Sequence, residues 1–376
     1  MPFAGPRFNA AAMSFSQREK NPPALQLPAL TSLRFIAATA VVLFHVPYVL
    51  PDSVGLSPLP EGALGVSFFF VLSGFILRHA HAPEGFRPLT FYRRRAARVL
   101  PLHHATLILW TCLFFASWGN SLEDKVNSGI ANLLAIHALF SGQLYTLGYN
   151  AVSWSISVEL VFYALFPLLL VGGRAMGVFA ALALTVLLLP GTAVAGLERA
   201  FPGFFHFHPL GRLLEFTAGM ALHAVWRHWQ PGEWVATMTQ IGAVLLLLVL
   251  VPASAAMPPH LRNLLLLAPF GLLILGFAWD GPLTRLLSRP LPVLLGEASF
   301  ALYMTHHMLF RLVDPLLAGL GVAMALPLAV FLATLLSVAV FLLFERPVRA
   351  LLNRPSTEGH SPLLRATPVP QGGGGS

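Results

Sequence analysis

The apolar stretch from Leu30 to Leu50, LTSLRFIAATAVVLFHVPYVL, constrains the fold of this chain more than any other feature. It is long enough to cross a bilayer as a helix, yet it contains an arginine and a histidine. Ionisable side chains inside a membrane are costly, so they usually face a protein interior or a wet cavity. Arg34 and His45 stand eleven residues apart, which places them on one helical face and roughly 16 Å apart along the axis. Both are candidate functional residues, unless Arg34 only snorkels to the interface and His45 only packs.

The composition predicts an all-α polytopic membrane protein. Hydrophobic residues make up 56% of the 376 residues and charged residues only 10%, whereas a soluble domain carries about 25% charged residues. The net charge of +8 does not indicate nucleic acid, because the basic residues lie mostly in short loops between apolar spans, where they set orientation. Cys112 is the only cysteine, which excludes an intrachain disulfide and a thiolate metal cluster. We expect contact with membrane lipids and no metal.

Ten segments have spanning length, and the basic loops predict how they are oriented. A further stretch, 130–147, is ambiguous, but if it spanned, the later basic loops would lie on the opposite side from the arginines of 83–98. We therefore predict about ten transmembrane helices with both termini cytoplasmic, and outer loops at 119–152 and 191–208. The predicted spans are 30–50, 62–82, 99–118, 153–171, 175–190, 209–229, 234–252, 263–279, 293–314 and 321–344.

This topology divides the chain into a polar cytoplasmic segment at 1–29, a transmembrane domain at 30–347 and a cytoplasmic tail at 348–376. The tail ends in Gly372 to Ser376, which resembles an added linker. We see no internal repeat of fixed period, which argues against an inverted-repeat transporter.

The predicted spans bring polar residues to similar depths. Ser155, Glu159 and Tyr163 recur at four-residue steps and so share one helical face. An acid flanked by two hydroxyls is hard to explain as packing alone. Ser73 and Gly74 leave room for a thin ligand or for a neighbouring backbone.

Two later spans add further ionisable groups. Arg212 and Glu215 are three residues apart and form either a functional pair or an internal structural ion pair. Tyr303 and His306 lie in the outer half of the ninth span.

Arginines concentrate where FYRRRAARVLPLHH enters the third span. Arginine suits forked hydrogen bonding to phosphate oxygens, so the cluster is a candidate anion site. Orientation and lipid headgroup contact are the alternative for some of them. Arg95 and Arg98 are closest to the membrane and are the better candidates for an inward role.

The chain also resembles a known family. LRFIAATAVVLFH, GVSFFFVLSGFIL, FYRRRAARVLPL, WSISVELVFYALFPLLL, RLLEFTAGM, SFALYMTHH and FERP are similar, in order, to the signatures of the membrane-bound acyltransferase-3 family. The resemblance runs from about Leu30 to Pro347. It implies an O-acyltransferase of the bacterial inner membrane that moves an acyl group, commonly acetyl from acetyl-coenzyme A, to a carbohydrate hydroxyl. Exopolysaccharide, O-antigen and lipid-linked glycan are candidate acceptors, and some relatives modify macrolides or other small molecules.

The resemblance also implies roles for residues. Arg34 and His45 match the family's arginine and essential histidine, Arg95 and Arg98 its arginine motif, Glu159 its serine–x–glutamate acid and His306 its late histidine. Three positions depart from the pattern: Phe35 replaces a frequent glycine, Ser67 a frequent acid and Thr305 a frequent tryptophan. These departures bear on the acceptor pocket rather than on the reaction class.

The residues fit acyl transfer chemically. A base must take the proton of the acceptor hydroxyl, and His45 can do so, with Glu159 orienting the imidazole or stabilising its charged form. Arg34, Arg95, Arg98 and Ser73 are the candidate donor-binding residues, and Ser155, Tyr163, Arg212, Glu215, Tyr303 and His306 are the candidates for substrate contact or support. A proton-coupled transporter would also place His, Glu and Arg within spans, and a lipid-binding scaffold would explain the arginines alone.

Overall fold

The computed structural model describes residues 27–49, 59–116, 120–173, 177, 180–182, 184–185 and 188–354. These residues fold into helices joined by short turns, with no strand among them. The longer helices are α2 (Pro28–Val49), α3 (Gly65–Ala80), α4 (Pro88–Phe114), α5 (Leu122–Leu133), α7 (Trp154–Val171), α9 (Gly191–Ala200), α11 (Pro209–His228), α12 (Glu233–Ala253), α13 (Pro259–Ala278), α15 (Pro290–Leu317) and α16 (Gly321–Val340).

Shorter elements connect them. They are η1 (Gly62–Leu64), η2 (His137–Leu139), α6 (Gln143–Thr146), η3 (Ala151–Ser153), α10 (Phe204–Phe207), α14 (Pro282–Leu287), the π-helical turn η4 (Phe341–Glu345) and α17 (Arg346–Leu352).

Seven helical segments among the described residues are long and apolar enough to cross a membrane, so the chain is a multi-pass membrane protein by length and composition. They are Pro28–Pro47, Gly62–Ala80, Pro88–Phe114, Ala151–Val171, Glu233–Ala253, Pro259–Ala278 and Gly321–Leu352. Helices α11 and α15 are also long, at 20 and 28 residues, but carry several charged side chains. Seven of the sixteen residues of the predicted fifth span, 175–190, lie outside the described residues. The count of ten spans and the side of each terminus remain predictions.

The ambiguous stretch 130–147 forms no spanning helix. It is divided among the end of the 12-residue α5, the turn η2 and the four-residue α6. The basic residues were expected mostly in loops between spans, but Arg93 to Arg98 lie on a helix, because α4 already begins at Pro88 and carries them in its first turns. Charge interrupts the apolar run there without interrupting the helix.

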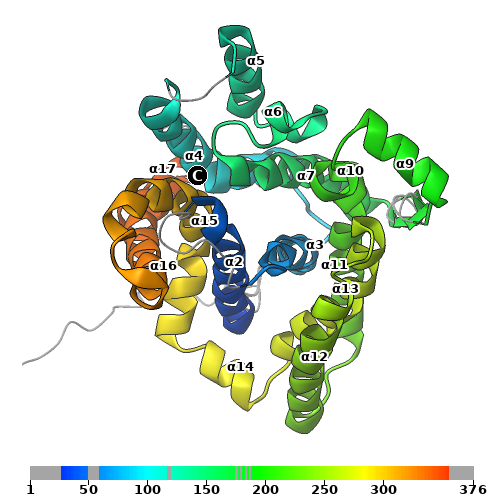
Figure 1. Ribbon diagram of the computed structural model, residues 1–376. Coiled ribbons are helices and arrows are strands. Elements are labelled where there is room, and N and C mark those ends of the chain that lie inside the picture. Colours follow the sequence, from blue (N-terminus) through cyan, green and yellow to red (C-terminus); the bar gives the residue numbers. More distant parts are fainter. Residues whose placement is uncertain are drawn as a thin grey trace, which may run out of the picture.

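Helices α2 and α3 lie near the middle of the bundle, with α4, α7, α11, α13, α15 and α16 around them (Figure 1). Glycines permit the closest crossings. A Cβ on Gly74 would lie 2.0 Å from the Phe216 carbonyl oxygen, and one on Gly219 would lie 1.9 Å from the Val71 oxygen. Close packing of α3 on α11 therefore explains Gly74, and Ser73, about 100° further round the helix, faces α7 instead.

Residues 120–153 are held to α4 by a buried polar network. His103 of α4 donates from Nε2 to the Asn132 carbonyl oxygen at 2.8 Å. Ser153 lies 3.3 Å from both the Asn132 side-chain oxygen and His137 Nε2. All four side chains are at most 1% exposed. The segment is thus docked on the bundle at one end of α4, with α5 and α6 at its periphery (Figure 1).

Candidate functional site

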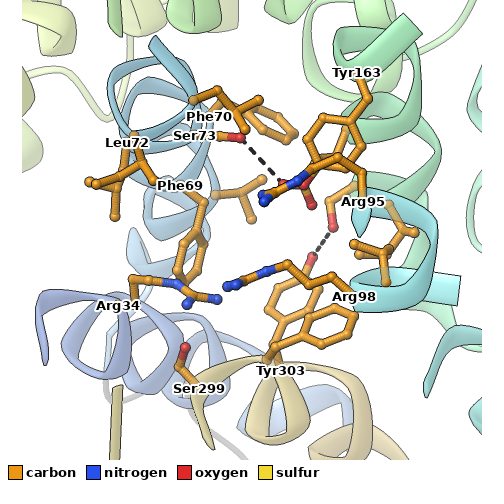
Figure 2. Close-up of a pocket in the computed structure, with 18 of the residues that line it drawn as sticks. Arg34, Phe69, Phe70, Leu72, Ser73, Arg95, Arg98, Tyr163, Ser299 and Tyr303 are labelled. Carbon is orange, nitrogen blue, oxygen red and sulfur yellow. Dashed lines mark hydrogen bonds between the residues drawn. The ribbon is translucent and has the colours of Figure 1, made fainter. Parts of the chain in front are cut away.

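A cavity of about 210 Å³ opens between α2, α3, α4, α7 and α15. Its lining is mostly apolar, with a few polar side chains that converge from all five helices (Figure 2). Eight of the twelve residues singled out from the sequence line it: Arg34, Ser73, Arg95, Arg98, Ser155, Glu159, Tyr163 and Tyr303. An apolar cavity with convergent polar groups is the usual form of a small-molecule site.

The cavity carries excess positive charge. Three guanidinium groups, those of Arg34, Arg95 and Arg98, face one carboxylate, that of Glu159. Figure 2 shows Arg34 and Arg98 pointing toward one another from α2 and α4. Guanidinium groups in such a poorly solvated place favour an anionic ligand between them.

Arg95 is held among aromatic rings. Its guanidinium carbon lies 5.9 Å from the ring centres of Phe91 and Tyr163, and its buried Nε has no hydrogen-bond partner among the described residues. The neighbouring Arg93 and Arg94 are exposed and do not line the cavity. The four arginines therefore divide into a pair that lines the cavity, Arg95 and Arg98, and an exposed pair.

Glu159 receives its hydrogen bonds from two side chains that also line the cavity. Tyr163, one turn further along α7, donates its hydroxyl to Glu159 Oε1, and Ser73 of α3 donates to the same oxygen at 3.3 Å. The four-residue spacing seen in the sequence brings the tyrosine and the acid together. The structure joins Glu159 to Ser73 and Tyr163, and it shows no hydrogen bond from Glu159 to His45 within the described part of the chain.

Tyr303 lines the cavity from α15 and is held in place by hydrogen bonds. Its hydroxyl donates to the Val152 carbonyl oxygen at 2.8 Å and accepts from Ser155 at 2.8 Å. Its ring lies 6.3 Å from those of Phe69 and His306. Tyr303 therefore lines the cavity and lies beside His306.

His45 lies outside the cavity lining and beside His306. Nδ1 of His45 is 2.9 Å from the Val41 carbonyl oxygen and 3.4 Å from His306 Nε2. His306 Nδ1 is 3.1 Å from the Leu302 carbonyl oxygen. A carbonyl oxygen only accepts, so both Nδ1 atoms carry the hydrogen in the neutral rings. The lone pair of His45 is consequently on Nε2, which is the nitrogen able to accept a proton.

Arg212 and Glu215 form a separate buried pair that does not line the cavity. Arg212 Nε lies 3.2 Å from Glu215 Oε2, and both residues are 2% exposed. Arg212 also donates to Ser67 Oγ at 2.8 Å and covers the Phe70 ring at 5.3 Å. Ser67, one of the departures from the family pattern, is thus part of this pair's surroundings. The geometry favours the structural alternative for Arg212 and Glu215.

Sequence reasoning missed two residues near the cavity. Phe69 sits in an apolar FFF run that carries no polar signal. Glu345 lies in the π-helical turn within FERP and is 5% exposed. Its Oε1 is 3.9 Å from Nη1 of Arg349, and the positive charges of Arg98 and Arg34 interact favourably with its carboxylate. π-helical turns often mark functional sites, which was the available structural signal.

Known proteins are similar to this chain in sequence. The family model described as "Acyltransferase domain" (Acyl_transf_3) matches residues 27–346. Acyltransferase MdmB of Streptomyces mycarofaciens is 31% identical over 329 residues, which is 79% of this chain and 82% of that protein. The exopolysaccharide production protein ExoZ of Rhizobium meliloti is 27% identical over 300 residues, or 76% and 89% of the two chains.

A more distant relative shares only part of its length. The peptidoglycan O-acetyltransferase OatA of Listeria monocytogenes is 23% identical over 227 residues, which is 53% of this chain and 34% of that protein. No solved structure matches the chain.

Proposed function

Because the chain belongs to the acyltransferase-3 family, we propose that it is a membrane O-acyltransferase that moves an acetyl group from acetyl-coenzyme A to a carbohydrate hydroxyl. The observation that carries the proposal is the cavity, where Arg34, Arg95 and Arg98 converge on a mostly apolar space. Coenzyme A combines phosphates with a long, thin pantetheine arm. Arginines suit the phosphates, and the apolar walls suit the arm.

In this proposal His45 is the general base. The oxygen of the acceptor hydroxyl attacks the thioester carbonyl carbon and gives its proton to His45 Nε2. The tetrahedral intermediate collapses by breaking the carbon–sulfur bond, and the proton passes from His45 to the departing thiolate. The products are the acyl ester and coenzyme A. The support for this role is the free lone pair on Nε2, which follows from the contacts of Nδ1 with Val41 and His306.

In this proposal Glu159 does not orient the His45 imidazole, which was the role expected from the sequence. Its contacts with Ser73 and Tyr163 favour a role in holding the donor-binding wall and balancing the charge of Arg95. His306, rather than Glu159, is the side chain in a position to orient His45.

The acceptor class rests on the relatives. ExoZ is named for exopolysaccharide production and OatA for peptidoglycan O-acetylation, so we propose a cell-envelope carbohydrate as the acceptor and the bacterial inner membrane as the location. Small-molecule acylation is the alternative, and the same assay distinguishes the two.

The test uses purified protein in nanodiscs with radiolabelled acetyl-coenzyme A, first alone and then with fractionated glycans or macrolides. We expect slow hydrolysis without acceptor and ester formation with glycans, both lost in His45→Ala. His228→Ala is the matched control, because His228 makes the same contact with the carbonyl four residues earlier but lies exposed at the end of α11. Thioester turnover that survives His45→Ala would refute the general base, and absence of any turnover or donor binding in the parent protein would refute the function.

A further inference from the structure

The histidine pair does not line the cavity, and two neighbouring aromatic rings lie in the cavity wall near His306. Tyr303 and Phe69 both line the cavity, whereas His45 and His306 do not. The rings of Tyr303 and Phe69 meet edge to face, with centres 6.3 Å apart and an interplanar angle of 74°. The Tyr303 ring is also 6.3 Å from the ring of His306, and the ring centre of His45 lies 5.3 Å from that of His306.

The position of these two rings in the cavity wall bears directly on how the acyl donor is bound. With phosphates at the arginines and the base at His45, the thioester carbonyl must lie where the cavity approaches the histidines, and the acyl chain must fit beside the two rings. We infer that Tyr303 and Phe69 select the length of the acyl chain, an inference that rests on the proposed function. Tyr303 bounds the space for the chain from α15, and Phe69 bounds it from α3.

The two rings differ in how firmly they are held. Tyr303 is 6% exposed and its hydroxyl is bonded to both Val152 and Ser155, so its ring cannot turn aside without breaking two hydrogen bonds. Nearby, Asn150 donates to the Met304 carbonyl oxygen at 2.9 Å and fixes η3 to α15. Phe69 has no polar anchor. We therefore expect Tyr303 to set a hard limit on chain length and Phe69 to adjust within it.

The experiment compares acetyl-, propionyl-, butyryl- and hexanoyl-coenzyme A as donors for full-length protein in nanodiscs. One methylene in an apolar pocket is worth about 10- to 200-fold in kcat/KM. The parent protein is expected to prefer acetyl over butyryl strongly. Tyr303→Ala should raise the butyryl-to-acetyl ratio of kcat/KM by about tenfold or more, since the lost ring leaves room for the added methylenes. Tyr303→Phe keeps the ring and should stay closer to the parent ratio.

A matched control is available in Tyr149. Like Tyr303 it is 6% exposed and donates its hydroxyl to a backbone carbonyl, that of Lys125 at 2.7 Å, but it does not line the cavity. Tyr149→Ala should leave the chain-length ratio unchanged even if it lowers the yield of protein. Phe69→Ala and Tyr303→Leu carry the test if Tyr303→Ala does not fold, and both should shift the ratio in the same direction.

The outcomes separate this inference from the proposed function. A parent protein that turns over acetyl-coenzyme A, with ratios unchanged in Phe69→Ala and the folded Tyr303 variants, overturns the selector and leaves the function intact. A parent that uses butyryl as well as acetyl also overturns it. A parent protein that neither binds nor hydrolyses any acyl-coenzyme A overturns the function and the selector together.

Discussion

The reactivity of His45 depends on which of its nitrogens is already engaged. Nδ1 faces the Val41 carbonyl oxygen and His306 Nε2, which leaves Nε2 as the basic atom. His306 is itself fully buried and anchored to the Leu302 carbonyl oxygen, so it presents a fixed acceptor to His45. This arrangement is the one that a base needs in order to keep one tautomer and one orientation.

The first prediction separates the base from the residue that positions it. His45→Ala should lower kcat by about 10²- to 10⁴-fold, the usual loss for a general base. His306→Ala should lower kcat less while the KM for acetyl-coenzyme A stays near the parent value. Steady-state kinetics on the two single variants and the double variant measure this. If the histidines act as one unit, the double variant should be little worse than His45→Ala, and fully additive losses would contradict the coupling.

The second prediction concerns the inward arginines. Arg95→Ala and Arg98→Ala should each weaken coenzyme A binding by about tenfold or more, because a charge-assisted hydrogen bond contributes about 1.5–3 kcal/mol. Lysine at either position should restore binding only in part, because it lacks the guanidinium fork. Isothermal titration calorimetry in nanodiscs measures the affinity.

Arg93→Ala is the control for that experiment, since Arg93 lies on the same helix but is exposed. Donor affinity that is unchanged in the folded Arg95 and Arg98 variants would assign these arginines to membrane orientation or lipid contact instead.

At the scale of elements, the segment 120–153 is held in place by buried histidines. Burial, with a smaller contribution from the nearby His103, lowers the pKa of His137 from 6.5 to about 3. Above pH 6.5 the ring is neutral whether the segment is docked or free. Below it, only the free segment takes up the proton, so docking loses stability as the pH falls toward 3.

The third prediction follows from this pKa. Between pH 6.5 and about pH 5 the docked segment should lose about 2 kcal/mol of stability, at roughly 1.4 kcal/mol per pH unit. Hydrogen exchange of residues 128–137, corrected for the intrinsic pH dependence of exchange, should show protection falling in this range. His137→Asn keeps a side chain that can bond Ser153 but does not titrate, so its protection should be lower yet nearly independent of pH. An equal pH dependence in both proteins would rule out His137 as the cause.

At the scale of the whole molecule, we predict the orientation of the helices in the membrane from the basic loops, which favour the cytoplasmic side. The arginine-lined cavity lies between the first turns of α2 and α7, the second to fourth turns of α4, the middle of α15 and nearly the whole length of α3. The His45 and His306 pair lies further along α2 and α15. The predicted topology therefore puts the donor entrance on the cytoplasmic side and the histidines in the outer half.

The fourth prediction tests that orientation by cysteine labelling of intact cells. The exposed Cys112 is first replaced by alanine. A membrane-impermeant maleimide should then modify Asn127→Cys and spare Arg285→Cys, while permeabilised cells should label both. Arg285 is a surface residue, and its ion pairs with Glu233 and Asp280 are half-exposed, so its replacement should cost little stability. Labelling of Arg285→Cys in intact cells, with Asn127→Cys spared, would reverse the predicted topology.

Much of this protein could be predicted from local sequence. Apolar length predicted the spanning helices, because a bilayer demands that each segment satisfy its own backbone hydrogen bonds. Four-residue spacing predicted that Glu159 and Tyr163 meet, because helical geometry alone decides contacts one turn apart. Arg95 and Arg98 were expected to point inward because they are the arginines of their cluster closest to the membrane, and both line the cavity.

Contacts between helices could not be read in this way, because they depend on crossings set by packing. Only the tertiary structure pairs Glu159 with Ser73 of α3, places His306 of α15 beside His45, and joins Arg212 to Ser67 of α3 rather than to the cavity. Phe69 has no polar signal in the sequence, yet its ring lies beside that of Tyr303 in the wall of the cavity. The sequence by itself determined which helices exist and which face of each is polar. The close approach of glycines such as Gly74 and Gly219 decided which polar faces meet, because interhelical distance and register are properties of the packed bundle.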